Sequence, residues 1–142
     1  MEGVEDGILL INKAEGKTSH DVVQKVRRIL GVNKVGHAGT LDPFATGLLV
    51  ILVGQGTKLS EFLRPLAKTY EAVVRLGIET DTYDRTGKII RKAGEIRITE
   101  EDVQFAVRGF LGEIEQIPPP FSAIKIKGKR AYQLARKGKE VN

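Results

Sequence analysis

The sequence of 142 residues contains no cysteine, which excludes a disulfide framework and thiolate chemistry. It contains only two histidines, His20 and His37, which is too few to favour a zinc site. The longest apolar run, residues 48–53, is far shorter than the roughly 20 residues that a membrane helix needs. The first six residues include acidic side chains where a signal peptide would be basic. These absences predict a cytoplasmic protein with no contact to a membrane.

The composition, 41% hydrophobic and 29% charged, is that of one ordinary folded domain. The net charge of +5 is unevenly distributed along the chain. Residues 121–142 carry seven basic side chains and one acidic one, whereas the other 120 residues carry 16 basic and 17 acidic ones. A nearly neutral body with one cationic segment is typical of a protein that binds a polyanion. A merely solvated surface segment would have the same composition.

Hydrophobic periodicity predicts alternating strands and helices. We expect strands at residues 7–12, 48–53, 69–77, 88–92 and 121–126. We expect helices at residues 19–30 after a cap at Thr18 or Ser19, from about 57 to 66, from Thr99 to about 111, and at 132–136. The apolar run at residues 48–53 suits a strand buried on both faces.

The most informative segment is the non-periodic run from Gly36 to Gly47, GHAGTLDPFATG. It concentrates one carboxylate, Asp42, and one imidazole, His37, among three glycines that would allow unusual backbone angles and close approach. These two side chains are the groups in the run that can act as acid, base or nucleophile. The run is therefore typical of an active-site loop. An aspartate followed by a proline is also typical of a helix N-cap, so the pair alone leaves both interpretations open.

Two other candidate sites fail on their residue types. Gly31 and Gly36 have the spacing of a phosphate loop, but His37 and Ala38 stand where lysine and a hydroxyl residue are needed. The carboxylates at positions 79, 81 and 84 lie in a turn-rich segment, where solvated side chains are more common than metal ligands. We therefore predict no metal and no cofactor.

The run from Gly36 resembles the catalytic motif of the bacterial TruB-type tRNA pseudouridine synthases, which isomerise the uridine at position 55 in the T-loop of tRNA. Four further segments resemble motifs of this family in the same order: residues 10–19, 68–70, 76–82 and 116–125. Ala14 stands where the family usually has proline. The resemblance implies an α+β fold, with a mixed, mostly antiparallel sheet flanked by helices and the active-site cleft across the sheet.

The resemblance also implies roles for individual residues. Asp42 matches the catalytic aspartate, whose action as nucleophile or as base stays open. Tyr70 matches the tyrosine that stacks on the flipped base, although its expected strand face would equally suit the core. His37 matches the residue that enters the T-loop, although a local hydrogen bond within the loop is the simpler alternative. Structural support of the site is expected from Lys13, Gly16, Gly36 and Gly39.

Residues 121–142 resemble the RNA-binding thumb of the family. The thumb side chains expected to contact tRNA are Lys125, Lys127, Lys129, Arg130 and Arg136. The resemblance makes residues 1–142 an N-terminal part of the catalytic domain, and this sequence lacks the family's second half and C-terminal RNA-binding domain. We expect a monomer when the enzyme is complete, or a second polypeptide that carries the remainder.

Two alternative functions stay open at this point. One is the RNA-guided relative found in archaea and eukaryotes, whose aspartate motif is similar. The other is a non-catalytic tRNA-binding module that acts as a chaperone. Release of tritium from carbon 5 of uridine would separate an enzyme from a binding module, and dependence on a guide RNA would separate the two enzymes.

Overall fold

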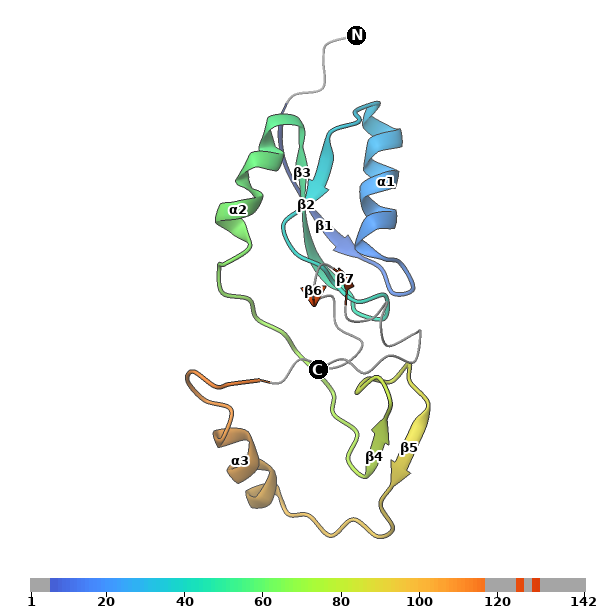
Figure 1. Ribbon diagram of the computed structural model, residues 1–142, viewed down its shortest axis with the longest axis vertical. Helices are drawn as coiled ribbons and strands as arrows, with labels where there is room; N and C mark the ends of the chain where they lie inside the picture. Colours follow the sequence, from blue (N-terminus) through green and yellow to red (C-terminus); the bar gives the residue numbers. More distant parts are fainter. Residues whose placement is uncertain (1–5, 117–124, 127–128, 131–142) are drawn as a thin grey trace. The chain divides into compact units, whose positions relative to one another are not determined.

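The computed structural model describes residues 6–116, 125–126 and 129–130. The chain divides into two compact units, residues 1–70 and 71–142 (Figure 1). The expected helix at residues 132–136 lies outside the described residues. Within the described part, no helix is long and apolar enough to cross a membrane.

The first unit is built on a three-stranded antiparallel sheet with the order β1-β3-β2 (Figure 1). Strand β1 spans Gly7–Lys13, β2 spans Val35–His37 and β3 spans Gly47–Val53. The central strand β3 pairs with β1 from Gly7↔Val53 to Lys13↔Gly47. Both faces of its last three residues are buried, as the apolar run predicts, while Leu48 near its start is 64% exposed.

Helix α1 spans Ser19–Leu30 and packs on the face of the sheet that carries alternate residues of β3. A capping box begins the helix, because Thr18 accepts the N–H of Asp21 and the Asp21 carboxylate accepts the N–H of Thr18. Gly31 ends it in the left-handed conformation, with φ 65°. The predicted cap and stop are both confirmed.

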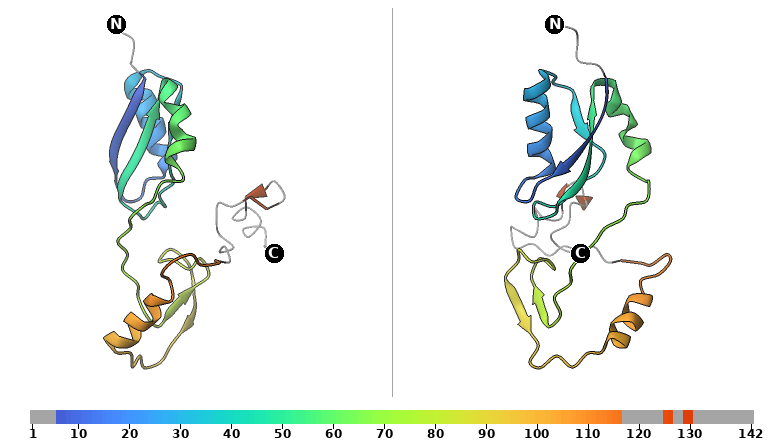
Figure 2. Two further views of the ribbon diagram at one scale, coloured as in Figure 1. Left: turned by 90° about the vertical axis from the view of Figure 1, so that its left-hand side faces the viewer. Right: turned by 180° about the vertical axis from the view of Figure 1, so that it is seen from behind.

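The chain then forms a 3-10 helix, η1, at Gly54–Leu59 and one short helix, α2, at Ser60–Leu63. The sequence predicts a helix that continues to Leu66, and this prediction is wrong. Pro65 explains the early end, since a proline has no N–H to continue the hydrogen bonds of the helix, although Arg64 before it is still helical with φ −62° and ψ −42°. Figure 2 shows α2 on the other side of the sheet from α1.

The second unit holds the hairpin of β4 (Ile78–Thr80) and β5 (Ile89–Lys92), followed by α3 (Glu100–Arg108). The expected strand at 88–92 is confirmed, and so is the start of a helix at Thr99, which forms a capping box with Asp102. The helix ends at Arg108, before the predicted limit near residue 111.

The predicted strand at residues 69–77 is wrong, because residues 67–76 form no regular structure. A strand requires a neighbour that accepts and donates its backbone hydrogen bonds, and none of the described strands pairs with this segment. Its side chains are accordingly exposed, Val73 at 99% and Tyr70 at 67%. Strand formation starts only at Ile78, where β5 supplies the partner.

Two short strands, β6 (Lys125–Ile126) and β7 (Lys129–Arg130), pair antiparallel within the basic segment. Strand β6 is the described part of the strand predicted at 121–126, whereas β7 lies beyond the predicted range. Every strand pair among the described residues is antiparallel, and helices accompany the sheets in both units. The α+β prediction is therefore confirmed.

Candidate active-site loop

The loop at residues 38–46 connects the edge strand β2 to the central strand β3. The N–H of Ala38 donates to the carbonyl of Val50 at 3.0 Å, which extends the pairing of β2 by one residue. Asp42 then begins a turn, because its carbonyl accepts the N–H of Ala45 at 3.0 Å with Pro43 at the second position. No helix follows, so the N-cap interpretation of the Asp-Pro pair is wrong.

Ser19, the first residue of α1, holds the residue before Asp42. Its Oγ accepts the N–H of Leu41 at 3.0 Å and donates to the carbonyl of Leu41 at 3.2 Å. The side chain is only 3% exposed. One hydroxyl thus satisfies both backbone groups of Leu41. In the sequence, Ser19 is only a possible helix cap, and no spacing rule links it to position 41.

Lys13 and Gly16 hold the residue after Asp42. The N–H of Gly16 donates to the carbonyl of Pro43 at 2.7 Å, and the Lys13 ammonium donates to the same carbonyl at 3.3 Å. Lys13 is fully buried and also donates to the carbonyls of Lys17 at 2.7 Å and Ala14 at 3.1 Å. Gly16 has φ 77°, a conformation that favours glycine.

The Asp42 side chain is exposed at the start of this turn, although the backbone on either side is held. None of the ion pairs found in the described part of the chain involves it. The described residues contain no group of three metal-ligating side chains. This arrangement presents one positioned carboxylate to a molecule that approaches from solvent.

His37 is the last residue of β2, and its ring lies half-buried beside the same loop. Its Nδ1 lies 2.6 Å from the carbonyl oxygen of Gly39, so Nδ1 carries the proton and donates. This is the local hydrogen bond that the sequence leaves open as an alternative. The bond fixes the ring and leaves Nε2 for another contact.

The glycines of the loop differ in what they require. Gly47 has φ 112° and needs glycine for its backbone angle. Gly36 and Gly39 do not have positive φ angles. A Cβ at Gly36 would lie 3.9 Å from Thr57, and one at Gly39 would lie 3.7 Å from Lys68. The expectation that glycine is needed for an unusual backbone angle or for close approach of another part of the protein is therefore wrong for Gly36 and Gly39.

Tyr70 lies at the end of the first unit, and its ring is 67% exposed. The alternative that it belongs to the core is therefore wrong. Two residues earlier, the Lys68 ammonium donates to the carbonyls of Arg64 at 2.7 Å and Leu66 at 2.8 Å. A Cβ at Gly39 would lie 3.7 Å from the Lys68 side chain, so the segment that leads to Tyr70 passes beside the candidate loop.

The turn between β4 and β5 uses its carboxylates to shape the backbone. Burial raises the pKa of Asp84, but hydrogen bonds from Thr86 and Thr82 outweigh it and hold that pKa below its ordinary value. The Asp81 carboxylate accepts the N–H of Lys88 at 2.8 Å. Both carboxylates therefore stabilise the hairpin.

The thumb residues are described only in part. Lys125, Lys129 and Arg130 belong to the hairpin of β6 and β7. Lys127 and Arg136 lie outside the described residues.

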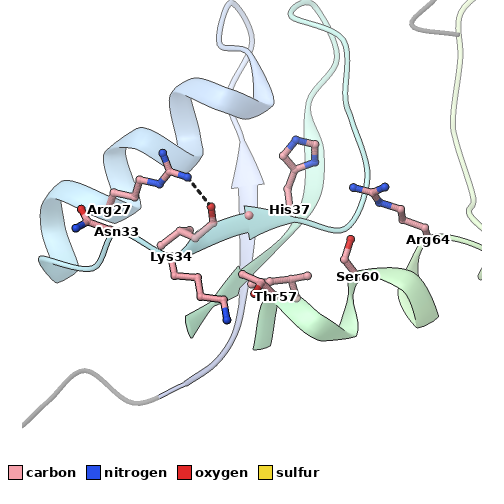
Figure 3. A pocket seen from close by; sticks show the side chains of 10 residues that line it. Arg27, Asn33, Lys34, His37, Thr57, Ser60 and Arg64 are labelled. Atoms are coloured by element: carbon pink, nitrogen blue, oxygen red, sulfur yellow. Dashed lines mark hydrogen bonds between the residues drawn. The ribbon is translucent and has the colours of Figure 1, made fainter. Parts of the chain in front are cut away.

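A pocket of about 660 Å³ lies along β2, and Figure 3 shows its side chains. It is lined by Arg27, Asn33, Lys34, Val35, Gly36, His37, Leu52, Thr57, Ser60 and Arg64. Of these residues, the sequence alone indicated only Gly36 and His37 as site residues. The others are contributed by α1, the turn before β2, Val35 of β2, β3, η1 and α2 with the residue after it, segments that only the fold brings together.

Comparison with known proteins shows the family of the chain. Residues 27–142 match the model of the TruB family pseudouridylate synthase (N terminal domain). The chain belongs to this family. It is 50% identical over 139 residues to tRNA pseudouridine synthase B of Thermotoga maritima, covering 98% of this chain and 45% of that protein. It is 52% identical over 137 residues to the protein of that name from Aquifex aeolicus, covering 96% and 47%.

A crystal structure of a Cbf5-Nop10-Gar1 complex contains a similar fold. The TM-score is 0.56 at 27% identity, and the match covers 84% of this chain and 31% of that one. The likeness supports the pseudouridine synthase fold. The chain spans about half the length of the curated relatives it matches.

Proposed function

We propose that the whole protein is a tRNA pseudouridine synthase that isomerises the uridine at position 55 of the T-loop. The observation that carries the proposal is the exposed carboxylate of Asp42 in a turn held on both sides, by Ser19 at Leu41 and by Gly16 and Lys13 at Pro43. Membership of a pseudouridylate synthase family supports assigning the isomerisation chemistry to this carboxylate. As a cytoplasmic enzyme, the protein would act where mature and maturing tRNA is found.

The reaction breaks the bond between the ribose and nitrogen 1 of uracil and forms a bond from the ribose to carbon 5. Carbon 5 loses its proton and nitrogen 1 gains one, so no oxidant, metal or other cofactor is consumed. Asp42 is the proposed catalytic residue, acting as nucleophile or as base. A backbone held at Leu41 and at Pro43 limits the positions that this carboxylate can take, which favours attack from one fixed direction.

A uridine inside a folded T-loop must leave its stack before a carboxylate can reach it, at a cost of a few kcal/mol. The exposed ring of Tyr70 is available to stack on the extruded base, and such stacking contributes about 1–3 kcal/mol. The two magnitudes are similar, so stacking offsets much of the cost. His37, with its ring fixed by Gly39, is proposed to enter the T-loop and fill the space that the base leaves.

The cationic segment at residues 121–142 is proposed as the thumb that contacts the T-stem-loop. Its net charge of +6 exceeds that of the whole chain, which is +5. Lysine and arginine side chains that neutralise RNA phosphates release counterions and contribute affinity without reading the sequence. We propose that the complete enzyme is a monomer. The alternative is an enzyme encoded as two chains, in which a second polypeptide supplies the rest of the site.

The test replaces the carboxylate without changing its size. Asp42→Asn in the whole protein should abolish tritium release from tRNA labelled at carbon 5 of uridine, while tRNA affinity stays within severalfold. The matched control is Asp102→Asn, which makes the same change at the exposed cap of α3 and should leave turnover unchanged. Turnover by the Asp42 variant at the rate of this control would contradict the proposal.

The RNA-guided alternative is favoured by one observation, the likeness to a chain of the Cbf5-Nop10-Gar1 complex. The identity to the bacterial tRNA enzymes is about twice as high, 50% against 27%. Activity on free tRNA without any added guide RNA would separate the two. The chaperone alternative fails if tritium is released at all.

A further inference from the structure

The pocket along β2 is strongly cationic. Three of its lining residues, Arg27, Lys34 and Arg64, are cationic, and no carboxylate is among the described residues that line it. Figure 3 shows that Arg27 comes from α1 on one side, while Arg64 extends toward the side where His37 lies. Like charges repel one another, so three cations around one space indicate a site for an anion.

The same pocket holds polar groups whose hydrogen bonds are not satisfied. Arg27 Nε and Ser60 Oγ are buried, and neither has a hydrogen-bond partner in the described part of the structure. Buried polar atoms without partners are rare, because each costs about 1–3 kcal/mol. Both groups can donate, and both would be satisfied by oxygen acceptors inside the pocket.

One member of the cationic group is already fixed in place. Arg27 donates through Nη2 to the carbonyl of Val35 at 3.0 Å, so its guanidinium is braced against β2. Among the described residues, the Lys34 ammonium makes one long contact of 3.5 Å, to the side-chain oxygen of Gln55. Arg64 follows α2 and is exposed, so Lys34 and Arg64 can reorient toward a ligand without breaking a strong contact.

We infer that this pocket binds one phosphate group of the tRNA backbone close to the T-loop, an inference that rests on the proposed function. A phosphate offers several acceptor oxygens and negative charge, which matches the unpaired donors and the three cations. His37 lines the same pocket and ends the strand from which the loop with Asp42 continues, so we expect RNA that meets the loop to reach the pocket as well.

The experiment removes charge where it does not brace the fold. Lys34→Gln/Arg64→Gln in the whole protein deletes two pocket cations and leaves Arg27 in place. The matched control is Lys25→Gln/Arg28→Gln, which deletes two exposed cations of α1 that do not line the pocket. The probes are a T-stem-loop RNA and a series of the same RNA with one neutral methylphosphonate linkage each. Thermal unfolding shows that both variants stay folded.

The inference predicts that the pocket variant binds the unmodified RNA about tenfold or more weakly, while the control pair binds as the wild type does. The slope of log affinity against log salt should flatten by about 0.7–0.9 for one lost phosphate contact. At one linkage near the T-loop, methylphosphonate should weaken binding to the wild type but have no further effect on the pocket variant.

Three results would overturn the inference. An equal loss in the control pair would show a general charge effect. Additive losses at every methylphosphonate linkage would show that the pocket contacts no backbone phosphate. If free inorganic phosphate competes with the RNA, but no single methylphosphonate linkage loses its effect in the pocket variant, the pocket is a site for a free anion instead. If the wild-type protein releases tritium and binds RNA, any of these three results contradicts the pocket inference and leaves the proposed function intact. If the wild-type protein does neither, the proposed function is contradicted as well.

Discussion

The hydroxyl of Ser19 provides a test of how the fold positions the candidate catalytic residue. Ser19→Ala removes one oxygen that accepts from Leu41 N–H at 3.0 Å and donates to Leu41 C=O at 3.2 Å. An unpaired buried backbone group costs about 1–3 kcal/mol. Leu41 is half-buried, so water reaches part of it. We therefore expect a loss of about 1–2 kcal/mol in the free energy of unfolding.

The effect on catalysis should be larger than this loss of stability suggests. Leu41 is adjacent to Asp42, and a misplacement of about 1 Å in a reacting group can lower the rate about 100-fold. We expect kcat of Ser19→Ala to fall by about 10- to 100-fold in the whole protein. KM for tRNA should change little, because the exposed RNA contacts are untouched. Single-turnover tritium release at saturating enzyme measures the chemical step directly.

Thr18→Ala is the matched control for this prediction. Thr18 precedes Ser19 and caps the same helix, and loss of a cap costs about 1 kcal/mol. Its hydrogen bonds go to Asp21 and not to the loop. The two variants should therefore be similarly destabilised, with only Ser19→Ala slowed in turnover. Equal turnover in the two variants would refute the positioning role of Ser19.

Three further predictions concern the loop and the second unit. Lys13→Met removes the ammonium donor from the carbonyls of Ala14, Lys17 and Pro43, of which that of Pro43 keeps the N–H of Gly16. It should lower the free energy of unfolding by about 2 kcal/mol in urea titration, after the relief of one buried charge is counted. Unchanged stability would contradict the role of the ammonium. Gly16→Ala should cost about 1–2 kcal/mol because of its φ of 77°, while Gly39→Ala should leave the melting temperature unchanged, since the added Cβ meets only ordinary contacts. Because the pKa of Asp84 is lowered in the folded state, its contribution is present above the ordinary aspartate range and is lost as the pH falls below about 4. The free energy of unfolding of Asp84→Asn should therefore fall less steeply with decreasing pH than that of the wild type. Parallel curves of this free energy against pH would contradict the role of Asp84.

Local sequence patterns predicted those elements that depend on neighbours in the chain. The ends of α1 followed from Thr18 and Gly31, because capping involves residues within one turn. The central strand followed from its apolar run, since burial on both faces requires hydrophobic residues at successive positions. The candidate loop was also evident, because the run from Gly36 to Gly47 combines reactive groups with no periodicity.

Tertiary structure alone decided the partners of those elements. The strand predicted at residues 69–77 did not form, because alternation does not supply a neighbouring strand. Ser19 reaches Leu41 across 22 positions and Lys13 reaches Pro43 across 30, distances over which no local pattern carries information. The sequence by itself therefore determined which residue carries the candidate chemistry, Asp42. Only the fold determined what holds it, because a backbone hydrogen bond between distant residues depends on where the whole chain has placed them.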